Sequence, residues 1–281
     1  MANADMENKN ASYNILFMPD LMSGKTALIL GVANKWSLAY AIAQAYLREG
    51  ANLILTYQSE RQKGTVDQLA ADLGAGITVL ACDVTVPGQL ESLAETIRTS
   101  HGKLDCVVHS IAFANREDLS RPFVETSRDG YLLAQEVSSY SLVAVARTMS
   151  PLMTNGGSIM TLSYLGSVRV IENYNVMGIA KAALEACVRY LSSDLGAKNI
   201  RVNAISAGPV KTTSARGIKD FSRVLDAVAS NAPLRRNTDP AEVADTAVFL
   251  GSDLGRGVTG NVIYVDAGFQ VMGLPVSGQQ S

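Results

Sequence analysis

The segment NYNVMGIAK, residues 173–181, places a tyrosine seven positions before a lysine. A tyrosine hydroxyl can donate a hydrogen bond to an oxygen that becomes negative during a reaction, and a lysine ammonium adds a fixed positive charge. Read as the opening of an amphipathic helix, the segment predicts that Tyr174, Gly178 and Lys181 share one face, because positions i, i+4 and i+7 of an α-helix do so. We expect roughly 10 Å along the helix axis between Tyr174 and Lys181.

This spacing bears on the reaction that the pair would assist. Reduction of a ketone brings hydride and proton to adjacent atoms, and a lysine one turn after the tyrosine, where this sequence has Gly178, would suit it. In a conjugated enoyl thioester, hydride reaches the β-carbon while charge accumulates on the carbonyl oxygen, two carbons further along. The spacing therefore favours an enoyl thioester. Tyr174 would donate to the enolate oxygen, and Lys181 would hold the ribose hydroxyls of a nicotinamide cofactor.

A second tyrosine, Tyr164, stands in TLSYLGS at the end of a predicted strand. Ligands of open α/β sheets bind at the carboxyl ends of the strands, so Tyr164 is expected at the same site. It would either orient the thioester or assist proton delivery, and the sequence leaves both roles open.

Short apolar runs alternate with segments of helical period from residue 25 onward. The runs are TALILGV, NLILTY, ITVLAC, LDCVVHSIA, GSIMTLSY, IRVNAIS and NVIYVDAG. Apolar runs without polar alternation indicate strands covered on both faces, and helices between them indicate right-handed crossovers. The sequence therefore predicts an α/β fold with a single Rossmann-like, doubly wound parallel sheet of about seven strands and helices on both faces.

The first predicted strand leads into a helix through LILGVANKWSLAYAIA. A helix N-terminus offers a phosphate its free N–H groups and the positive end of the helix dipole. Gly31 and Ser37 would form the turn and the cap, but Asn34 and Ala39 depart from a GxGxxG pattern. This segment by itself is weak evidence for a dinucleotide.

The ends of the next two strands strengthen the dinucleotide prediction. Gln58 ends the second strand, where dinucleotide folds place the residue that meets the adenosine ribose, and Asp83 and Val84 end the third. Asp83 would accept a hydrogen bond from the adenine amino group, and Val84 would pack on the ring. Gln58 is neutral and offers no charge to a 2'-phosphate, which favours NADH over NADPH, although Arg61 lies close in sequence.

The chain has no low-complexity linker and no repeat of solenoid period. We therefore predict one dinucleotide-binding catalytic domain over residues 22–273, preceded by a flexible extension at 1–21 and followed by a flexible tail at 274–281. Residues 207–239 form a long segment without clear periodicity, which is typical of a substrate-binding loop.

The composition argues against several other classes of protein. The 281 residues carry 24 Lys and Arg against 26 Asp and Glu, a formal net charge of −2, which indicates neither a nucleic-acid nor a membrane partner. No apolar run approaches the roughly 18 residues of a membrane span, and the opening residues do not resemble a secretory signal. Two histidines and three scattered cysteines predict no metal site, and such cysteines are typical of a reduced, cytoplasmic protein.

Nine segments together resemble a known family. They are GVANKWSLAYAIA, TYQSER, CDV, HSIAFA, TLSYLGS, NYNVMGIAKAALEA, RVNAISAGPVKT, GIKDF and YVDAGF. They are similar to segments of the NADH-dependent enoyl-acyl-carrier-protein reductases of bacterial type II fatty-acid synthesis, a divergent group of short-chain dehydrogenases/reductases. The resemblance covers roughly residues 21–273. It implies reduction of the trans-2 double bond of enoyl-acyl-carrier-protein thioesters, the last step of each elongation cycle.

The resemblance also implies roles for individual residues. The implied catalytic residues are Tyr164, Tyr174 and Lys181. The implied dinucleotide contacts are Gly31, Ser37, Leu38, Gln58, Asp83, Val84, Ser110, Ile111, Lys181, Val210 and Thr212. The implied substrate contacts are Ala114, Phe113, Met177 and Ile218. The departures from the family pattern, Trp36, Leu38 and Ala112, concern the cofactor pocket and not the proposed chemistry.

The family resemblance implies two kinds of partner. It implies a homotetramer, for which the small residues Ala180, Ala182, Ala183 and Ala186 would permit close helix packing. It also implies an acidic acyl carrier protein, for which Arg216, Lys219 and Arg223 would form a basic docking group beside Ile218 and Phe221. The alternative for this segment is a solvated charged loop. Two other functions stay open, a carbonyl reductase or alcohol dehydrogenase of the same superfamily, and a dinucleotide-binding sensor without catalysis.

Overall fold

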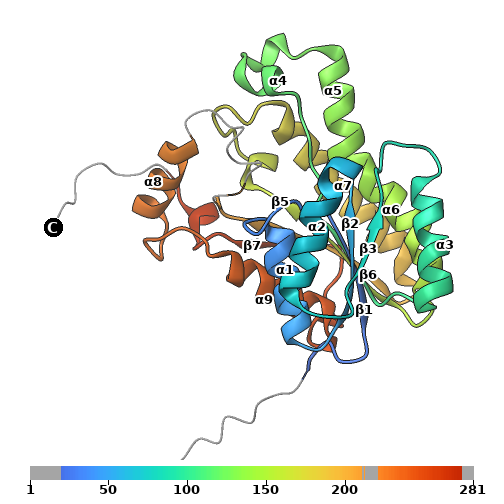
Figure 1. Ribbon diagram of the computed structural model, residues 1–281. Coiled ribbons are helices and arrows are strands. Elements are labelled where there is room, and N and C mark those ends of the chain that lie inside the picture. The colour runs from blue at the N-terminus through green and yellow to red at the C-terminus, as the bar shows by residue number, and fades with distance from the viewer. Residues whose placement is uncertain (1–19, 211, 213–220, 274–281) are drawn as a thin grey trace, which may run out of the picture.

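The computed structural model of the chain describes residues 20–210, 212 and 221–273 (Figure 1). Its centre is a seven-stranded sheet in the order β3-β2-β1-β4-β5-β6-β7, in which all neighbouring strands are parallel. The strands are β1 Thr26–Leu30, β2 Asn52–Tyr57, β3 Thr78–Ala81, β4 Cys106–His109, β5 Gly157–Ser163, β6 Ile200–Ala207 and β7 Val262–Val265. The predicted doubly wound parallel sheet is confirmed.

Helices cover both faces of this sheet, as the sequence predicts. They are α1 Leu38–Arg48, α2 Glu60–Leu73, α3 Gln89–His101, α4 Arg116–Ser120, α5 Arg128–Gln135, α6 Ser141–Met149, α7 Val176–Gly196, α8 Phe221–Asn231 and α9 Pro240–Gly251. Helices α1, α2 and α9 contribute to one core cluster, and α3, α6 and α7 contribute to the other. Along β1, Ala27 and Ile29 enter the first cluster while Leu28 and Leu30 enter the second, because successive side chains of a strand alternate between faces.

The strand order creates a crevice at the middle of the sheet. The chain runs outward from β1 to β2 and β3 and then returns to β4, on the other side of β1. In open α/β sheets, ligands bind outside the carboxyl ends of the strands at such a switch point. Figure 1 shows α4 and α5 at the top of the view, beyond the sheet, and α8 at the left.

The helix that carries Lys181 begins later than the sequence predicts. α7 starts at Val176, and Tyr174 lies in the preceding turn, where Asn173 and Asn175 have φ of 62° and 41°. Asparagine tolerates positive φ better than most residues. The Asn175 amide also donates to the backbone oxygens of Leu119 and Arg121 at 3.0 and 2.7 Å, which holds the turn. The prediction of one helical face from Tyr174 to Lys181 is therefore wrong.

The segment 207–239 is not irregular throughout, because α8 occupies Phe221–Asn231. Several predictions lie outside the described residues. They concern most of the extension at 1–21, the tail at 274–281, and Arg216, Ile218 and Lys219. In the described part of the chain, none of the helices has the length and apolar character needed to cross a bilayer.

Candidate active site

A cavity of about 540 Å³ lies at the carboxyl ends of the central strands. Its walls include all the predicted dinucleotide contacts except Val210, namely Gly31, Ser37, Leu38, Gln58, Asp83, Val84, Ser110, Ile111, Lys181 and Thr212. These residues follow different strands and meet because parallel strands end at one edge of the sheet. The volume lies within the usual range of ligand pockets, roughly 300 to 1,000 Å³. We call this space the cofactor cavity.

The turn between β1 and α1 is fixed by the chain's own contacts. Gly31 has φ of 93°, and a Cβ there would lie 2.0 Å from the Ser110 backbone oxygen, so only glycine fits between β1 and β4. Ser37 caps α1 by accepting a hydrogen bond from the Tyr40 N–H at 3.2 Å. The start of α1 therefore faces the cofactor cavity with the N–H groups and positive dipole end that suit a pyrophosphate.

Gln58 and Asp83 lie together in the wall of the cofactor cavity. Gln58 Nε2 donates to Asp83 Oδ2 at 3.0 Å, and Thr85 donates to Asp83 Oδ1 through its N–H and its hydroxyl. Burial acts to raise the pKa of the Asp83 carboxyl, but these hydrogen bonds outweigh burial and lower it. Asp83 is therefore an anionic acceptor near neutral pH. Arg61 is not among the residues that line this cavity.

A second, more apolar cavity of about 370 Å³ adjoins the first. The two cavities share Leu38, Ala112, Phe113 and Thr212. The predicted substrate contacts Phe113, Ala114 and Met177 line the second cavity, together with Tyr164, Tyr174 and Val210. We call it the substrate cavity. Of the predicted substrate contacts, only Ile218 lies outside the described residues.

The two tyrosines of the substrate cavity are in contact. The Tyr164 and Tyr174 ring centroids are 5.0 Å apart and the ring planes meet at 70°, an edge-to-face arrangement. Burial raises the pKa of Tyr164 to about 12 and raises that of Tyr174 further. Both hydroxyls therefore keep their protons near neutral pH and can donate them in hydrogen bonds.

Lys181 is buried beside the cofactor cavity, with 6% of its surface exposed. Its Nζ donates to the Leu162 backbone oxygen at 2.7 Å, which fixes the side chain against the end of β5. Burial lowers the pKa of Lys181 to about 8, and the nearby Glu185 charge opposes part of that effect. At neutral pH the ammonium is mostly charged, and it has three donors of which Leu162 takes one.

Gly166 makes room for the Tyr174 ring, and Gly178 makes room for the Gly166 backbone. A Cβ on Gly166 would lie 2.4 Å from Tyr174 Cδ1, and a Cβ on Gly178 would lie 2.8 Å from the Gly166 backbone oxygen. Gly166 belongs to the 3-10 turn Leu165–Ser167, directly after Tyr164. The sequence alone singles out Gly178 but gives Gly166 no role, because the contact depends on where the turn before α7 folds back.

We expect Gly166→Ala to lower kcat on the order of 100-fold, since misplacing a reacting group by about 1 Å has costs of that size. The methyl group would push the Tyr174 ring away while leaving the tyrosine itself unchanged. Steady-state rates with a crotonyl thioester measure the effect. Gly64→Ala is the matched control, because a Cβ there meets nothing within 4 Å. Equal rates for Gly166→Ala and wild type would contradict the steric argument.

A π-helix supports the wall that the two cavities share. Residues Glu136–Tyr140 form one π-helical turn between α5 and α6. It places the fully buried Ser138 hydroxyl 2.9 Å from the Phe113 N–H and 3.1 Å from the Phe113 oxygen. Ser138 thus holds the Phe113 backbone in place. Sequence reasoning missed it, because a π-turn has the same residue pattern as the α-helix around it.

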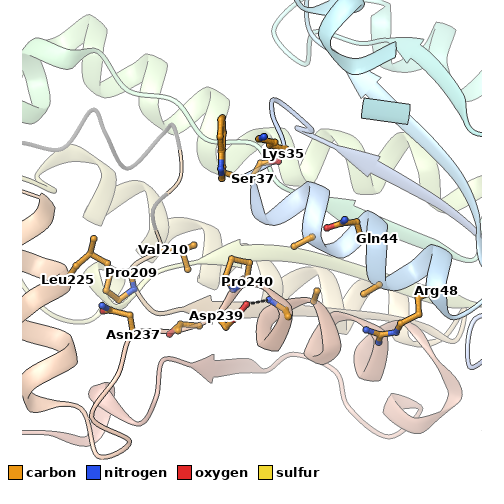
Figure 2. A pocket seen from close by; sticks show the side chains of 16 residues that line it. Lys35, Ser37, Gln44, Arg48, Pro209, Val210, Leu225, Asn237, Asp239 and Pro240 are labelled. Atoms are coloured by element: carbon orange, nitrogen blue, oxygen red, sulfur yellow. Dashed lines mark hydrogen bonds between the residues drawn. The ribbon is translucent and has the colours of Figure 1, made fainter. Parts of the chain in front are cut away.

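A third cavity, of about 650 Å³, is lined by residues of α1, α8 and α9 (Figure 2). Figure 2 shows Asp239 and Pro240 at the start of α9 in the middle of the view, Gln44 and then Arg48 along α1 to their right, and Pro209 and Leu225 to their left. None of the predicted catalytic residues lines it. The predicted catalytic residues all line the cofactor and substrate cavities.

The fold and these side chains together define a class of protein. Two tyrosines and a buried lysine line adjoining cavities at the switch point of a parallel sheet, an arrangement expected of short-chain dehydrogenases/reductases. A family model described as "Enoyl-(Acyl carrier protein) reductase" matches residues 31–270. The chain belongs to the enoyl-acyl-carrier-protein reductase family.

Individual relatives and solved structures agree with this assignment. An enoyl-[acyl-carrier-protein] reductase [NADH] of Bacillus cereus is 54% identical over 255 residues, which is 90% of this chain and 100% of the relative. A relative from Staphylococcus aureus, named as the [NADPH] enzyme, is 48% identical and covers 89% of this chain and 98% of its own. A crystal structure of the Anaplasma phagocytophilum reductase with NAD has a TM-score of 0.88 at 47% identity, and covers 92% of this chain and 98% of that one.

The family assignment decides between the functions that the sequence leaves open. The resemblance to enoyl-acyl-carrier-protein reductases is confirmed over nearly the whole domain. The comparisons therefore support an enoyl reductase. They do not support the two alternatives, a carbonyl reductase or alcohol dehydrogenase and a sensor without catalysis. The seven-residue spacing of Tyr174 and Lys181 agrees with this outcome, although a turn and not one continuous helix produces it.

Proposed function

We propose that this protein reduces the trans-2 double bond of enoyl-acyl-carrier-protein thioesters with NADH. The observation that carries the proposal is the shared wall of the two cavities, Leu38, Ala112, Phe113 and Thr212. A thioester beside the two tyrosines would meet a nicotinamide beside Lys181 across this wall. When bound, NADH supplies the hydride that the β-carbon of the thioester accepts.

The chain's own residues would act on the carbonyl end of the substrate and on the cofactor ribose. The Tyr174 hydroxyl, which burial keeps protonated, donates to the developing enolate oxygen. Tyr164 touches the Tyr174 ring and orients the thioester or assists proton delivery. The Lys181 ammonium donates to the nicotinamide ribose hydroxyls, and its charge favours the negative enolate.

NADH is the proposed cofactor. The relatives from Bacillus cereus and Bacillus subtilis carry NADH in their names, whereas the Staphylococcus aureus relative carries NADPH. The neutral Gln58 pairs with the anionic Asp83, and a 2'-phosphate near them would meet no complementary charge. Arg61 does not line the cavity, which supports the same preference.

The proposal includes an acyl carrier protein as partner, a homotetramer and a cytoplasmic location. For the tetramer, α7 offers Ala183 and Ala186 between the exposed side chains of Ile179 and Tyr190. Ala180, in contrast, is fully buried within the single chain and belongs to its own core. For the carrier protein, Arg223 is exposed on α8. Sedimentation of the purified protein tests the tetramer.

The first experiment compares two substrates with the same enzyme. NADH oxidation is followed with a crotonyl thioester and with an acetoacetyl thioester, and then with NADPH in place of NADH. We expect turnover of the crotonyl thioester alone and a higher kcat/KM with NADH. Preferential turnover of the acetoacetyl thioester would contradict the proposed reaction. A higher kcat/KM with NADPH would overturn the cofactor preference only.

Docking of the carrier protein has its own test. Charge reversal at Arg216, Lys219 and Arg223 is expected to raise KM for a carrier-bound crotonyl thioester and to leave KM for the coenzyme A thioester unchanged. The comparison separates docking from catalysis because both substrates present the same acyl group. An unchanged KM for the carrier-bound substrate would mean that these three side chains do not dock the carrier protein.

A further inference from the structure

Glu185 is a buried carboxylate next to the proposed catalytic residues. It lies one turn after Lys181 on α7, and only 5% of its surface is exposed. Its Oε1 accepts two short hydrogen bonds, from Ser163 Oγ at 2.5 Å and from Ser167 Oγ at 2.6 Å. Burying a charge costs free energy because the charge leaves water, and hydrogen-bond partners offset part of that cost. A buried carboxyl group at this place is therefore a candidate for a functional role.

The two serines bracket the segment that positions both tyrosines. Ser163 ends β5 and Ser167 ends the 3-10 turn, and Tyr164 and Gly166 lie between them. Tyr164 touches the Tyr174 ring, and Gly166 lies directly beneath that ring. One carboxylate on α7 therefore holds both ends of this segment, which we call the tyrosine segment (residues 163–167).

The same carboxylate stands one turn from Lys181. Lys181 is tied to the Leu162 oxygen, which directly precedes the tyrosine segment. In the described part of the chain, no ion pair within 4.0 Å joins Glu185 to a cation. The Glu185 charge opposes part of the effect of burial, which lowers the pKa of Lys181, while the hydrogen bonds of Glu185 go to the tyrosine segment.

We propose that Glu185 is a positioning residue for the reduction: it fixes the tyrosine segment to α7 and places its carboxyl group one helical turn from Lys181. This inference rests on the proposed roles of Tyr164, Tyr174 and Lys181. It explains why a hydrophobic helix carries an acid at a position where its side chain enters the protein.

Other ionisable groups lie near Lys181 and Glu185. They are His109 on β4, Arg169 and Tyr164 after β5, Tyr174 before α7, Tyr264 on β7 and Asp266 after β7. His109 is neutral, because burial lowers its pKa to about 3, and burial raises the pKa values of the three tyrosines. Arg169 and Asp266 act on Tyr264, whereas the Glu185 charge acts to raise the pKa of Lys181.

Glu185→Gln is the central variant, because it keeps the size of the side chain and an acceptor for the serines but removes the charge. We expect kcat with the crotonyl thioester to fall on the order of tenfold, less than the roughly 100-fold cost of a 1 Å misplacement. We also expect the alkaline limb of the kcat/KM profile for NADH to move to lower pH, because Lys181 loses the charge that opposes its deprotonation. Asp194→Asn removes an exposed charge from the same helix and is the matched control.

The double variant Ser163→Ala, Ser167→Ala separates the two parts of the role. It removes both hydrogen bonds and leaves the carboxylate, so kcat is expected to fall while the alkaline limb stays in place. If Glu185→Gln does not fold, as judged by NADH binding and thermal unfolding, Ser167→Ala alone supplies the kcat test.

Four results decide the proposal. A lower kcat and a shifted limb in Glu185→Gln, with neither in Asp194→Asn, would support it. Wild-type kcat and an unmoved limb in a folded Glu185→Gln would overturn it, and so would a lower kcat with an unmoved limb, which indicates structural support only. If Glu185→Gln does not fold, wild-type kcat in Ser167→Ala would also overturn the proposal. Wild-type enzyme that fails to reduce the crotonyl thioester would instead contradict the proposed function itself.

Discussion

Tyr174→Phe is expected to lower kcat by on the order of 100- to 1000-fold, the usual cost of removing one preorganised donor to a developing oxyanion. The change deletes only the hydroxyl, and the ring can keep its edge-to-face contact with Tyr164 and its place over Gly166. Binding of NADH should survive, because Tyr174 lines the substrate cavity and not the cofactor cavity. The effect should therefore appear in kcat with the crotonyl thioester while Kd for NADH stays constant.

The control for this prediction is Tyr190→Phe. Tyr190 is a tyrosine of α7 with 76% of its surface exposed, so loss of its hydroxyl leaves both cavities untouched. We expect wild-type kcat for it. A Tyr174→Phe enzyme that retains more than about a tenth of wild-type kcat would show that Tyr174 is not the principal donor. Tyr164→Phe would then be the variant to compare, because Tyr164 shares the cavity.

The fold could be predicted from the sequence because its strands carry an unambiguous signal. Runs such as TALILGV and NLILTY are apolar on both faces, which occurs when helices cover a parallel sheet on both sides. The position of the cofactor cavity followed from the same reasoning, since the carboxyl ends of parallel strands bring the residues after β1, β2 and β3 to one edge. Gly31, Gln58 and Asp83 all line it.

The local geometry of the tyrosines could not be predicted in the same way. Periodicity extended the helix back to Tyr174, but Asn173 and Asn175 take positive φ and the helix starts at Val176. The contacts that hold Asn175 come from Leu119 and Arg121, more than fifty residues earlier in the chain, and no local pattern encodes them. Gly166 and Glu185 were missed because their contacts with Tyr174 and with Ser163 and Ser167 depend on how the turn before α7 folds back on the end of β5.

The second large effect is expected at Lys181. Lys181→Met keeps a long side chain but removes the ammonium, whose hydrogen bonds to the ribose would contribute about 1.5 to 3 kcal/mol, as charge-assisted bonds do. We therefore expect kcat/KM for NADH to fall roughly 10- to 100-fold. The Leu162 oxygen also loses its donor, so thermal unfolding is measured alongside to separate loss of binding from loss of stability. Lys198→Met, an exposed lysine beyond the end of α7, is the control.

The pH dependence of kcat/KM for NADH tests whether the charge of the Lys181 ammonium is needed for the reaction. The pKa of Lys181 is about 8, so the ammonium loses its proton as the pH rises through that value, and kcat/KM for NADH should fall with it. The tyrosines keep their protons in this range, because burial raises the pKa of Tyr164 to about 12 and that of Tyr174 still further. The alkaline limb should therefore be absent from the Lys181→Met profile and present in Tyr174→Phe. A limb near pH 8 that persists in Lys181→Met would assign the titration to another group and contradict the proposed role of the ammonium.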